Sequence, residues 1–301
     1  MSGDVRYYFL ERKTDALDIK TILRKGTDIL KAVNNQSAVT DSRVILSYVL
    51  NCGNVFLYSH SDYMLTECEM KKFKELIQLR SEGTPLQHIT GCQEFMSLDF
   101  TVNSNVLIPR QETEILVETL INYANNLKTT DKIKHIKILD IGTGSGCIAI
   151  SLAFYIKNCY IEAVDISGDA INLAKHNAAL NGVDNRITFI LSDLFEDIGN
   201  NKFDIIVSNP PYIEKKQIDN LQTEVKDYEP ILALDGGADG LDFYRKIIGK
   251  AVYYLNNNGL LAFEIGYNQA KDVTCLMEQN FSKIEVIKDL DKNDRVVMGR
   301  N

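Results

Sequence analysis

The sequence lacks what several common classes of protein require. Its six cysteines form no CxxC pair and have no histidine at metal-ligand spacing, so we expect no zinc site, no other metal site and no disulfide framework. Its longest apolar stretch, residues 147–156, is far shorter than the roughly 20 residues that cross a bilayer. The first 15 residues lack the apolar core of a secretory signal. These absences favour a cytoplasmic protein that does not bind membranes.

An excess of basic residues is missing too. The 301 residues include 33 Lys and Arg against 41 Asp and Glu, a formal net charge of −8. Residues 1–90 are nearly neutral, with 12 basic and 11 acidic residues, so the acidic excess belongs to the remainder. A polyphosphate backbone is held by positive charge, and stable nucleic-acid binding is therefore disfavoured. The length and the ordinary globular composition indicate about two domains.

The pattern of apolar residues changes near residue 90. Before it, apolar positions recur at helical intervals, and Thr66 with Glu69 has the spacing of a capping box at the start of a helix. Residues 1–88 are therefore predicted to form a small helical bundle. Residues 89–109 include strand-like alternation and turn-forming residues, which predict a β-hairpin linker.

Residues 110–301 are predicted to form a domain in which strands and helices alternate. Seven apolar runs have the character of strands, at 136–141, 160–165, 187–191, 203–209, 259–266, 283–288 and 295–300. Such alternation requires a mostly parallel sheet that is covered on both faces. The link between the last two runs is too short for a crossover helix, so these two strands should be antiparallel.

Ligands of such sheets bind at the carboxyl ends of the parallel strands, where three features of the sequence lie. The first is a glycine-rich loop that allows close backbone approach before a helix start, formed by Gly142, Thr143, Gly144, Ser145 and Gly146. The second is Asp165, which can accept from ribose hydroxyls, and Asp193 after the third strand can accept from an adenine amino group. A tight turn without a ligand, a capping Asp and a plain loop Asp are the alternatives.

The third feature is the tetrad Asn209-Pro210-Pro211-Tyr212 at the end of the fourth strand. Proline fixes the backbone and removes donors, so neighbouring carbonyls can face a ligand instead of joining the sheet. Asn209 and a proline-fixed carbonyl can together bind a planar NH2 group, while Tyr212 covers its flat face. A rigid loop that only ends the strand would leave the flanking Asn and Tyr unexplained. The tetrad therefore predicts a site for a planar amine or amide.

Together these features resemble the class I methyltransferases that use S-adenosylmethionine, and the tetrad resembles that of the branch that methylates planar nitrogen. Within that branch, most of the chain resembles the release factor glutamine methyltransferases. The segments that carry the resemblance are residues 84–91, 106–114, 138–150 and 209–213, with Glu229-Pro230, Gly236-Gly237 and Asp239-Gly240-Leu241. His88 and Gln111 depart from the family, which commonly has Tyr and Pro there, and neither lies at a proposed cofactor or amide position.

The resemblance implies a fold, an activity and residue roles. It implies a Rossmann-like seven-stranded sheet with an antiparallel last strand, preceded by a helical domain for substrate recognition. The activity would be transfer of one methyl group to the side-chain amide nitrogen of the glutamine in the GGQ tripeptide of peptide chain release factors, with S-adenosylmethionine as cofactor. The implied roles are Gly142, Gly144 and Gly146 under the methionine part, Asp165 at ribose, Asp193 with Leu194 at adenine, and Asn209 with the Pro210 carbonyl at the substrate amide. We expect the chain to act as a monomer.

Three other functions remain open on the residues alone. DNA or RNA adenine-N6 methyltransferases use the same tetrad, because the exocyclic amine of adenine is also planar, but they generally need a basic groove. A nicotinamide oxidoreductase would explain the glycine loop and leave the tetrad unused. A protein that binds the cofactor without catalysis is the non-enzyme alternative.

Overall fold

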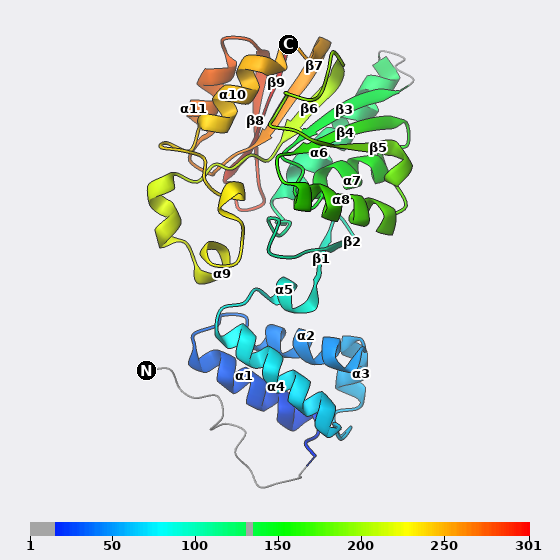
Figure 1. Cartoon of the computed structure of the whole chain (residues 1–301), viewed down its shortest axis with the longest axis vertical. Coiled ribbons are helices and arrows are strands. Elements are labelled where there is room, and N and C mark those ends of the chain that lie inside the picture. Colours follow the sequence, from blue (N-terminus) through cyan, green and yellow to red (C-terminus); the bar gives the residue numbers. More distant parts are fainter. Residues whose placement is uncertain (1–15, 131–134) are drawn as a thin grey trace. The chain divides into compact units, whose positions relative to one another are not determined.

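The computed structural model describes residues 16–130 and 135–301. The chain divides into two compact units, Met1–Gly91 and Cys92–Asn301 (Figure 1). The first 15 residues of the predicted bundle lie outside the described residues. Over the described ranges, no helix combines the length and the apolar character needed to cross a membrane.

The first unit is helical, as predicted. Its helices are α1 (Ile19–Ala32), α2 (Ala38–Leu50), α3 (Asn54–Ser59), α4 (Glu67–Ser81) and α5 (Leu86–Thr90). The predicted capping box is present, since Thr66 accepts from the N–H of Glu69 while the Glu69 side chain accepts from the N–H of Thr66. Helices α1, α2 and α4 pack around one apolar core. Within it Arg80 Nε lies 2.7 Å from Asp41 Oδ2, and both side chains are buried.

The second unit is built on a seven-stranded sheet. Its strands are β3 (Ile136–Ile141), β4 (Cys159–Asp165), β5 (Ile187–Leu191), β6 (Phe203–Ser208), β7 (Leu255–Glu264), β8 (Ser282–Lys288) and β9 (Asp294–Arg300). They lie in the order β5-β4-β3-β6-β7-β9-β8. Strands β3 to β7 are parallel to one another, whereas β9 is antiparallel to both β7 and β8. The predicted sheet with an antiparallel last strand is confirmed.

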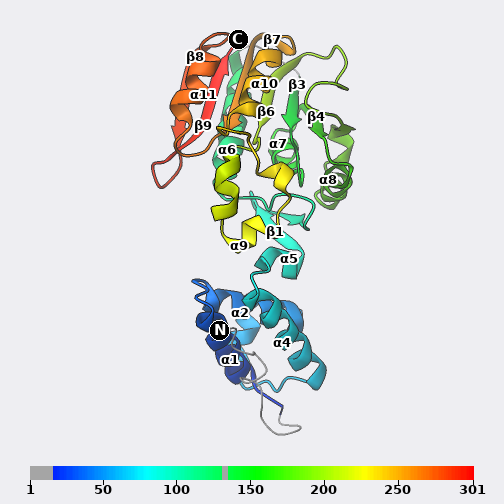
Figure 2. The ribbon, with the colours of Figure 1, turned by 60° about the vertical axis from the view of Figure 1, so that its left-hand side comes forward.

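Helices cover both faces of this sheet (Figures 1 and 2). One core joins α6 (Thr113–Thr130), α7 (Cys147–Tyr155) and α8 (Gly168–Leu180) to the sheet. The other core joins α10 (Asp242–Ala251) and α11 (Ala270–Met277) to the opposite face. Ser167 caps α8 by accepting from the N–H of Ala170, which confirms the predicted helix start.

The predicted hairpin consists of β1 (Cys92–Phe95) and β2 (Leu98–Thr101), which pair antiparallel. Phe95 and Phe100 lie in the same core as α6 and α7. Asn177 of α8 bonds both the N–H and the carbonyl of Thr101. The hairpin is therefore packed as part of the second unit. Short helical turns complete the chain at Asp184–Arg186, Lys215–Asn220, α9 (Thr223–Lys226) and Ile231–Ala233.

Candidate functional site

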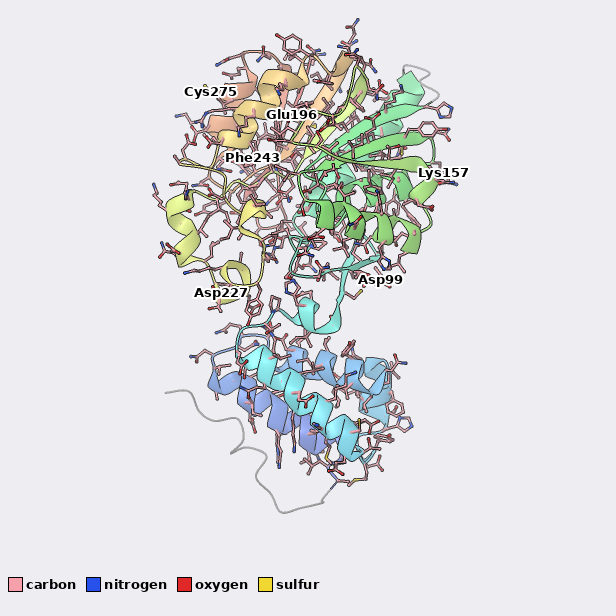
Figure 3. All side chains as sticks on the ribbon, in the orientation of Figure 1. Asp99, Lys157, Glu196, Asp227, Phe243 and Cys275 are labelled. Atoms are coloured by element: carbon pink, nitrogen blue, oxygen red, sulfur yellow. The ribbon has the colours of Figure 1, made fainter. Side chains whose placement is uncertain are left out.

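A cavity of about 370 Å³ lies at the carboxyl ends of β3, β4 and β6. Ten of the residues predicted to form the site line it: Gly142, Thr143, Gly144, Ser145, Asp165, Asp193, Leu194, Asn209, Pro210 and Pro211. Phe243 of α10, labelled in Figure 3, lies on the wall. The alternation of strands and helices thus brings together residues from four separate connections, because the carboxyl ends of the parallel strands meet at one edge of the sheet.

The glycine loop combines conformational and packing requirements. Gly142 and Gly144 have φ of 73° and 55°, which residues with side chains rarely adopt. Gly146 is not among the residues that line the cavity. A Cβ on Gly146 would lie 2.7 Å from Ile150 Cδ1 and 3.1 Å from Ala174 Cβ, so this glycine lets α7 and α8 pack closely.

Asp165 ends β4 and faces the glycine loop. Its Oδ2 accepts from the N–H of Gly144 at 2.8 Å, and its Oδ1 accepts from the N–H of Ser167 at 2.9 Å. Burial raises the pKa of this carboxyl, and the two backbone donors oppose the rise. A carboxylate has further lone pairs, so Asp165 keeps acceptor capacity toward the cavity while it holds the loop.

Asp193 and Leu194 line the cavity beyond β5. Leu194 has φ of 53°, an unusual value for a residue with a large side chain. The Ser192 hydroxyl donates to the Leu194 carbonyl at 3.3 Å and accepts from the N–H of Asp197 at 3.0 Å. These bonds hold the turn in a conformation that it would not otherwise prefer, as is often found at ligand sites.

The tetrad follows β6, and only its first three residues line the cavity. The carbonyl of Tyr212 accepts from Gln269 Nε2 at 3.0 Å, and the Tyr212 side chain packs against the core under α10. Burial raises the pKa of the Tyr212 phenol to about 12, so this group stays protonated at neutral pH. The structure thus places Tyr212 beside the site rather than on its wall.

Two residues that the sequence did not single out hold the Asn209 side chain. Asn209 Nδ2 donates to Thr113 Oγ1 at 3.3 Å, and Thr113 Oγ1 donates to Glu264 Oε2 at 2.6 Å. Thr113 is the first residue of α6 and Glu264 the last of β7, and both are buried. Burial raises the pKa of Glu264 to about 7, although Thr113 opposes the rise. One feature of the sequence could have identified Glu264 as a site residue, namely its position as an acidic residue at the carboxyl end of an apolar strand.

Asp140 is a second buried carboxyl near the loop. Its Oδ2 accepts from the Thr143 hydroxyl at 2.7 Å, while its Oδ1 has no hydrogen-bond partner among the described residues. Burial raises the pKa of Asp140 to about 7, and the charge of Asp165 adds to the rise. Two carboxyl groups therefore lie at the loop, where they favour a positively charged ligand.

The segment before α6 forms another wall of the cavity, through Val106, Leu107, Pro109 and Arg110 among others. Glu229 anchors this segment. Its Oε2 accepts from Arg110 at 2.7 Å and its Oε1 from the N–H of Ile108 at 3.3 Å. Pro230, the next residue, lines the cavity as well. This segment, which is among those that carry the family resemblance, thus contributes to the lining of the cavity.

Comparisons with known proteins agree with this geometry. A family model described as methyltransferase small domain matches residues 112–227, and one described as PrmC N-terminal domain matches residues 21–91. The chain is 42% identical over 287 residues to a release factor glutamine methyltransferase of Clostridium acetobutylicum, covering 94% of this chain and 98% of the relative. It is 40% identical over 292 residues to one of Geobacter sulfurreducens, covering 95% and 99%.

Among solved structures, the hMettl16 catalytic domain in complex with the MAT2A 3'UTR hairpin 6 is similar to this chain, with a TM-score of 0.53 and 18% identity. The similarity covers 75% of this chain and 81% of that one, and it indicates a shared fold alone. The two release factor glutamine methyltransferases, in contrast, are at least 40% identical to this chain over nearly the full length of both proteins, which establishes the family. The chain belongs to the release factor glutamine methyltransferase family.

Proposed function

We propose that this chain transfers a methyl group from S-adenosylmethionine to the side-chain amide nitrogen, N5, of the glutamine in the GGQ tripeptide of peptide chain release factors. The reaction would modulate translation termination. The observation that supports it most is the Asn209 amide at the wall of the cavity, bonded through its nitrogen to Thr113 and followed by two prolines. Membership of the family gives the substrate class.

The residues of the cavity fit the cofactor. S-adenosylmethionine is positively charged at sulfur, and the buried carboxyl groups of Asp140 and Asp165 favour a cation. When bound, this cofactor supplies a methyl carbon whose bond to sulfur breaks as a bond to nitrogen forms. We assign the glycine loop to its methionine part, Asp165 to its ribose, and Asp193 with Leu194 to its adenine.

Asn209 and Pro210 would bind the substrate amide. An amide nitrogen is a poor nucleophile because its lone pair is shared with the carbonyl, so it must be held in line with the methyl carbon. The Oδ1 of Asn209 and the carbonyl oxygen of Pro210 would accept its two N–H bonds. As the methyl group transfers, the nitrogen becomes positive, and these acceptors bind it more strongly than in the ground state. The surplus proton then leaves the nitrogen for water, and Pro211 with Tyr212 holds the loop.

The first unit would recognise the release factor, and the chain would act as a monomer without stable nucleic-acid binding. The test is incubation of the purified chain with S-adenosylmethionine and a release factor, followed by intact-mass measurement. One methyl transfer adds about 14 Da, and peptide mapping should locate it on the GGQ glutamine. Duplex DNA, single-stranded DNA and RNA are assayed in parallel with labelled methyl groups. Labelling of a nucleic acid with an unmodified release factor would support the adenine methyltransferase instead.

Asn209→Ala tests the proposed contact with the substrate. We expect turnover to fall more than about tenfold with cofactor affinity retained, because Asn209 acts chiefly in the transition state. Turnover is followed by transfer of radiolabelled methyl groups, and affinity by calorimetry. Asn200→Ala, at an exposed position away from the cavity, is the matched control and should behave as wild type. Unchanged turnover in Asn209→Ala would exclude the assigned role.

A further inference from the structure

The amide of Asn209 has two ends that differ chemically, and only one of them accepts hydrogen bonds. For Asn209 to accept from a substrate NH2 group, its oxygen must face the substrate and its nitrogen must face the protein. Resting on the proposed function, we propose that Glu264 and Thr113 are positioning residues that hold the Asn209 amide in this orientation. Neither touches the reacting atoms in this proposal, since both act through Asn209.

The orientation follows from the order of donors and acceptors. An ionised Glu264 has no proton, so the hydroxyl between it and Asn209 must donate to the carboxylate, as it does at 2.6 Å. The Thr113 oxygen then has only lone pairs left for Asn209, and it accepts from Nδ2 at 3.3 Å. The Asn209 oxygen is thereby left for the substrate. A chain of polarised hydrogen bonds that starts at a carboxylate also makes that oxygen a stronger acceptor.

Protonation of Glu264 would remove this constraint. A neutral carboxyl can donate to Thr113, whose own proton is then free to turn toward the Asn209 oxygen and stabilise the inverted amide. The charged and titratable groups that face Glu264 are Arg295 of β9, Arg110 and Glu112 before α6, Cys147 of α7, Tyr212 of the tetrad and Tyr244 of α10. The two arginines lower the pKa of Glu264 and Glu112 raises it, but burial is the largest influence and leaves the pKa at about 7.

Kinetics at saturating release factor and S-adenosylmethionine test the proposal. Thr113→Val keeps the shape and removes the hydroxyl, and we expect kcat to fall about tenfold, with cofactor affinity within about threefold of wild type. Thr113→Ser restores the hydroxyl and should return kcat to within about twofold of wild type. The wild-type kcat should fall as the pH drops through 7, and Glu264→Gln should be slower and lose this pH dependence. Wild-type kcat in Thr113→Val, or a wild-type pH profile in Glu264→Gln, would overturn the proposal.

A second measurement separates this proposal from the proposed function. In NMR spectra with labelled asparagine side chains, the Asn209 amide is identified by its absence in Asn209→Ala. Its resonance should shift between pH 6 and pH 8 in the wild type and stop shifting in Glu264→Gln and Thr113→Val. A shift that disappears in both variants supports the positioning role even if no release factor is methylated. The opposite result is also possible: a release factor is methylated, but the pH-dependent shift of the Asn209 resonance is the same in both variants as in the wild type. That result would support the proposed function and overturn the positioning role.

Discussion

Replacing Asp140 by asparagine should stabilise the second unit at pH 8 and bring no gain at pH 5. Folding raises the pKa of Asp140 from 3.8 to about 7, mainly by burial. The folded chain therefore holds a proton that the unfolded chain has lost between these two pH values. The free energy of unfolding consequently falls as the pH rises from about 4 to about 7. Asparagine has almost the same shape as aspartate but carries no charge, so the free energy of unfolding of the variant does not fall with pH for this reason.

The magnitude follows from the shift. About three pKa units at 1.36 kcal/mol each correspond to about 4 kcal/mol of stability lost by the wild type at pH 8. In the variant, the Asn oxygen can keep the bond from the Thr143 hydroxyl. Its NH2 group would take the place of Oδ1, which has no hydrogen-bond partner among the described residues, and an unpaired buried group costs about 1 to 3 kcal/mol. A net gain of about 1 to 3 kcal/mol at pH 8 remains after this cost.

Urea unfolding at pH 5 and pH 8, without cofactor, measures this difference. At pH 5 the wild type has lost only about 1 to 2 kcal/mol by the same reckoning. The cost of the unpaired NH2 group offsets this, so the variant should be equal to the wild type or weaker. Calorimetry at pH 8 should show weaker binding of S-adenosylmethionine to Asp140→Asn, because the variant removes a negative charge at the loop. If Asp140→Asn lowered stability equally at both pH values, the ionised carboxylate would be stabilising and the reasoning would fail.

Two further substitutions probe one unit each. Asp165→Ala should weaken cofactor binding by about 1 to 3 kcal/mol, because the carboxylate that also holds the N–H of Gly144 is lost; wild-type affinity by calorimetry would refute this. Arg80→Met should lower the stability of the first unit by about 3 to 5 kcal/mol in urea unfolding, because it leaves the buried Asp41 without its 2.7 Å partner. Lys71→Met, which breaks an exposed pair with Glu75, should change stability by less than about 0.5 kcal/mol, and equal effects of the two would contradict the argument.

The sequence predicts most of the second unit because its signals are local. Seven apolar runs, the cap at Ser167 and the short link before β9 each depend on neighbouring residues, and the structure contains all of them. The cavity was predictable for a related reason, since parallel strands end at one edge of the sheet and bring the connections that follow them together.

The hydrogen bonds that position Asn209 were not predictable in this way. Thr113 lies 96 residues from Asn209 and 151 residues from Glu264, and no local pattern records that their side chains meet. The direction in which a side chain points after a turn could not be predicted from the sequence either. Gly146 and Tyr212 were predicted on the strength of their positions in the sequence, and the structure places the first between two helices and the second beside the core.

The buried carboxyl groups change the meaning of the formal net charge of −8. That figure counts Asp140 and Glu264 as ionised, but burial raises the pKa of each to about 7, so the formal count overstates their negative charge at neutral pH. They belong to β3 and β7, the two strands on either side of β6, which carries Asn209 at its end. Because an ionised carboxyl is costly to bury, neither group helps the fold at neutral pH. Under the proposed function, each would become favourable when positive charge arrives at the cavity or develops on the substrate nitrogen. The charge that suits a methyl transfer is therefore local to these strand ends, and the net charge of the chain reflects it only in part.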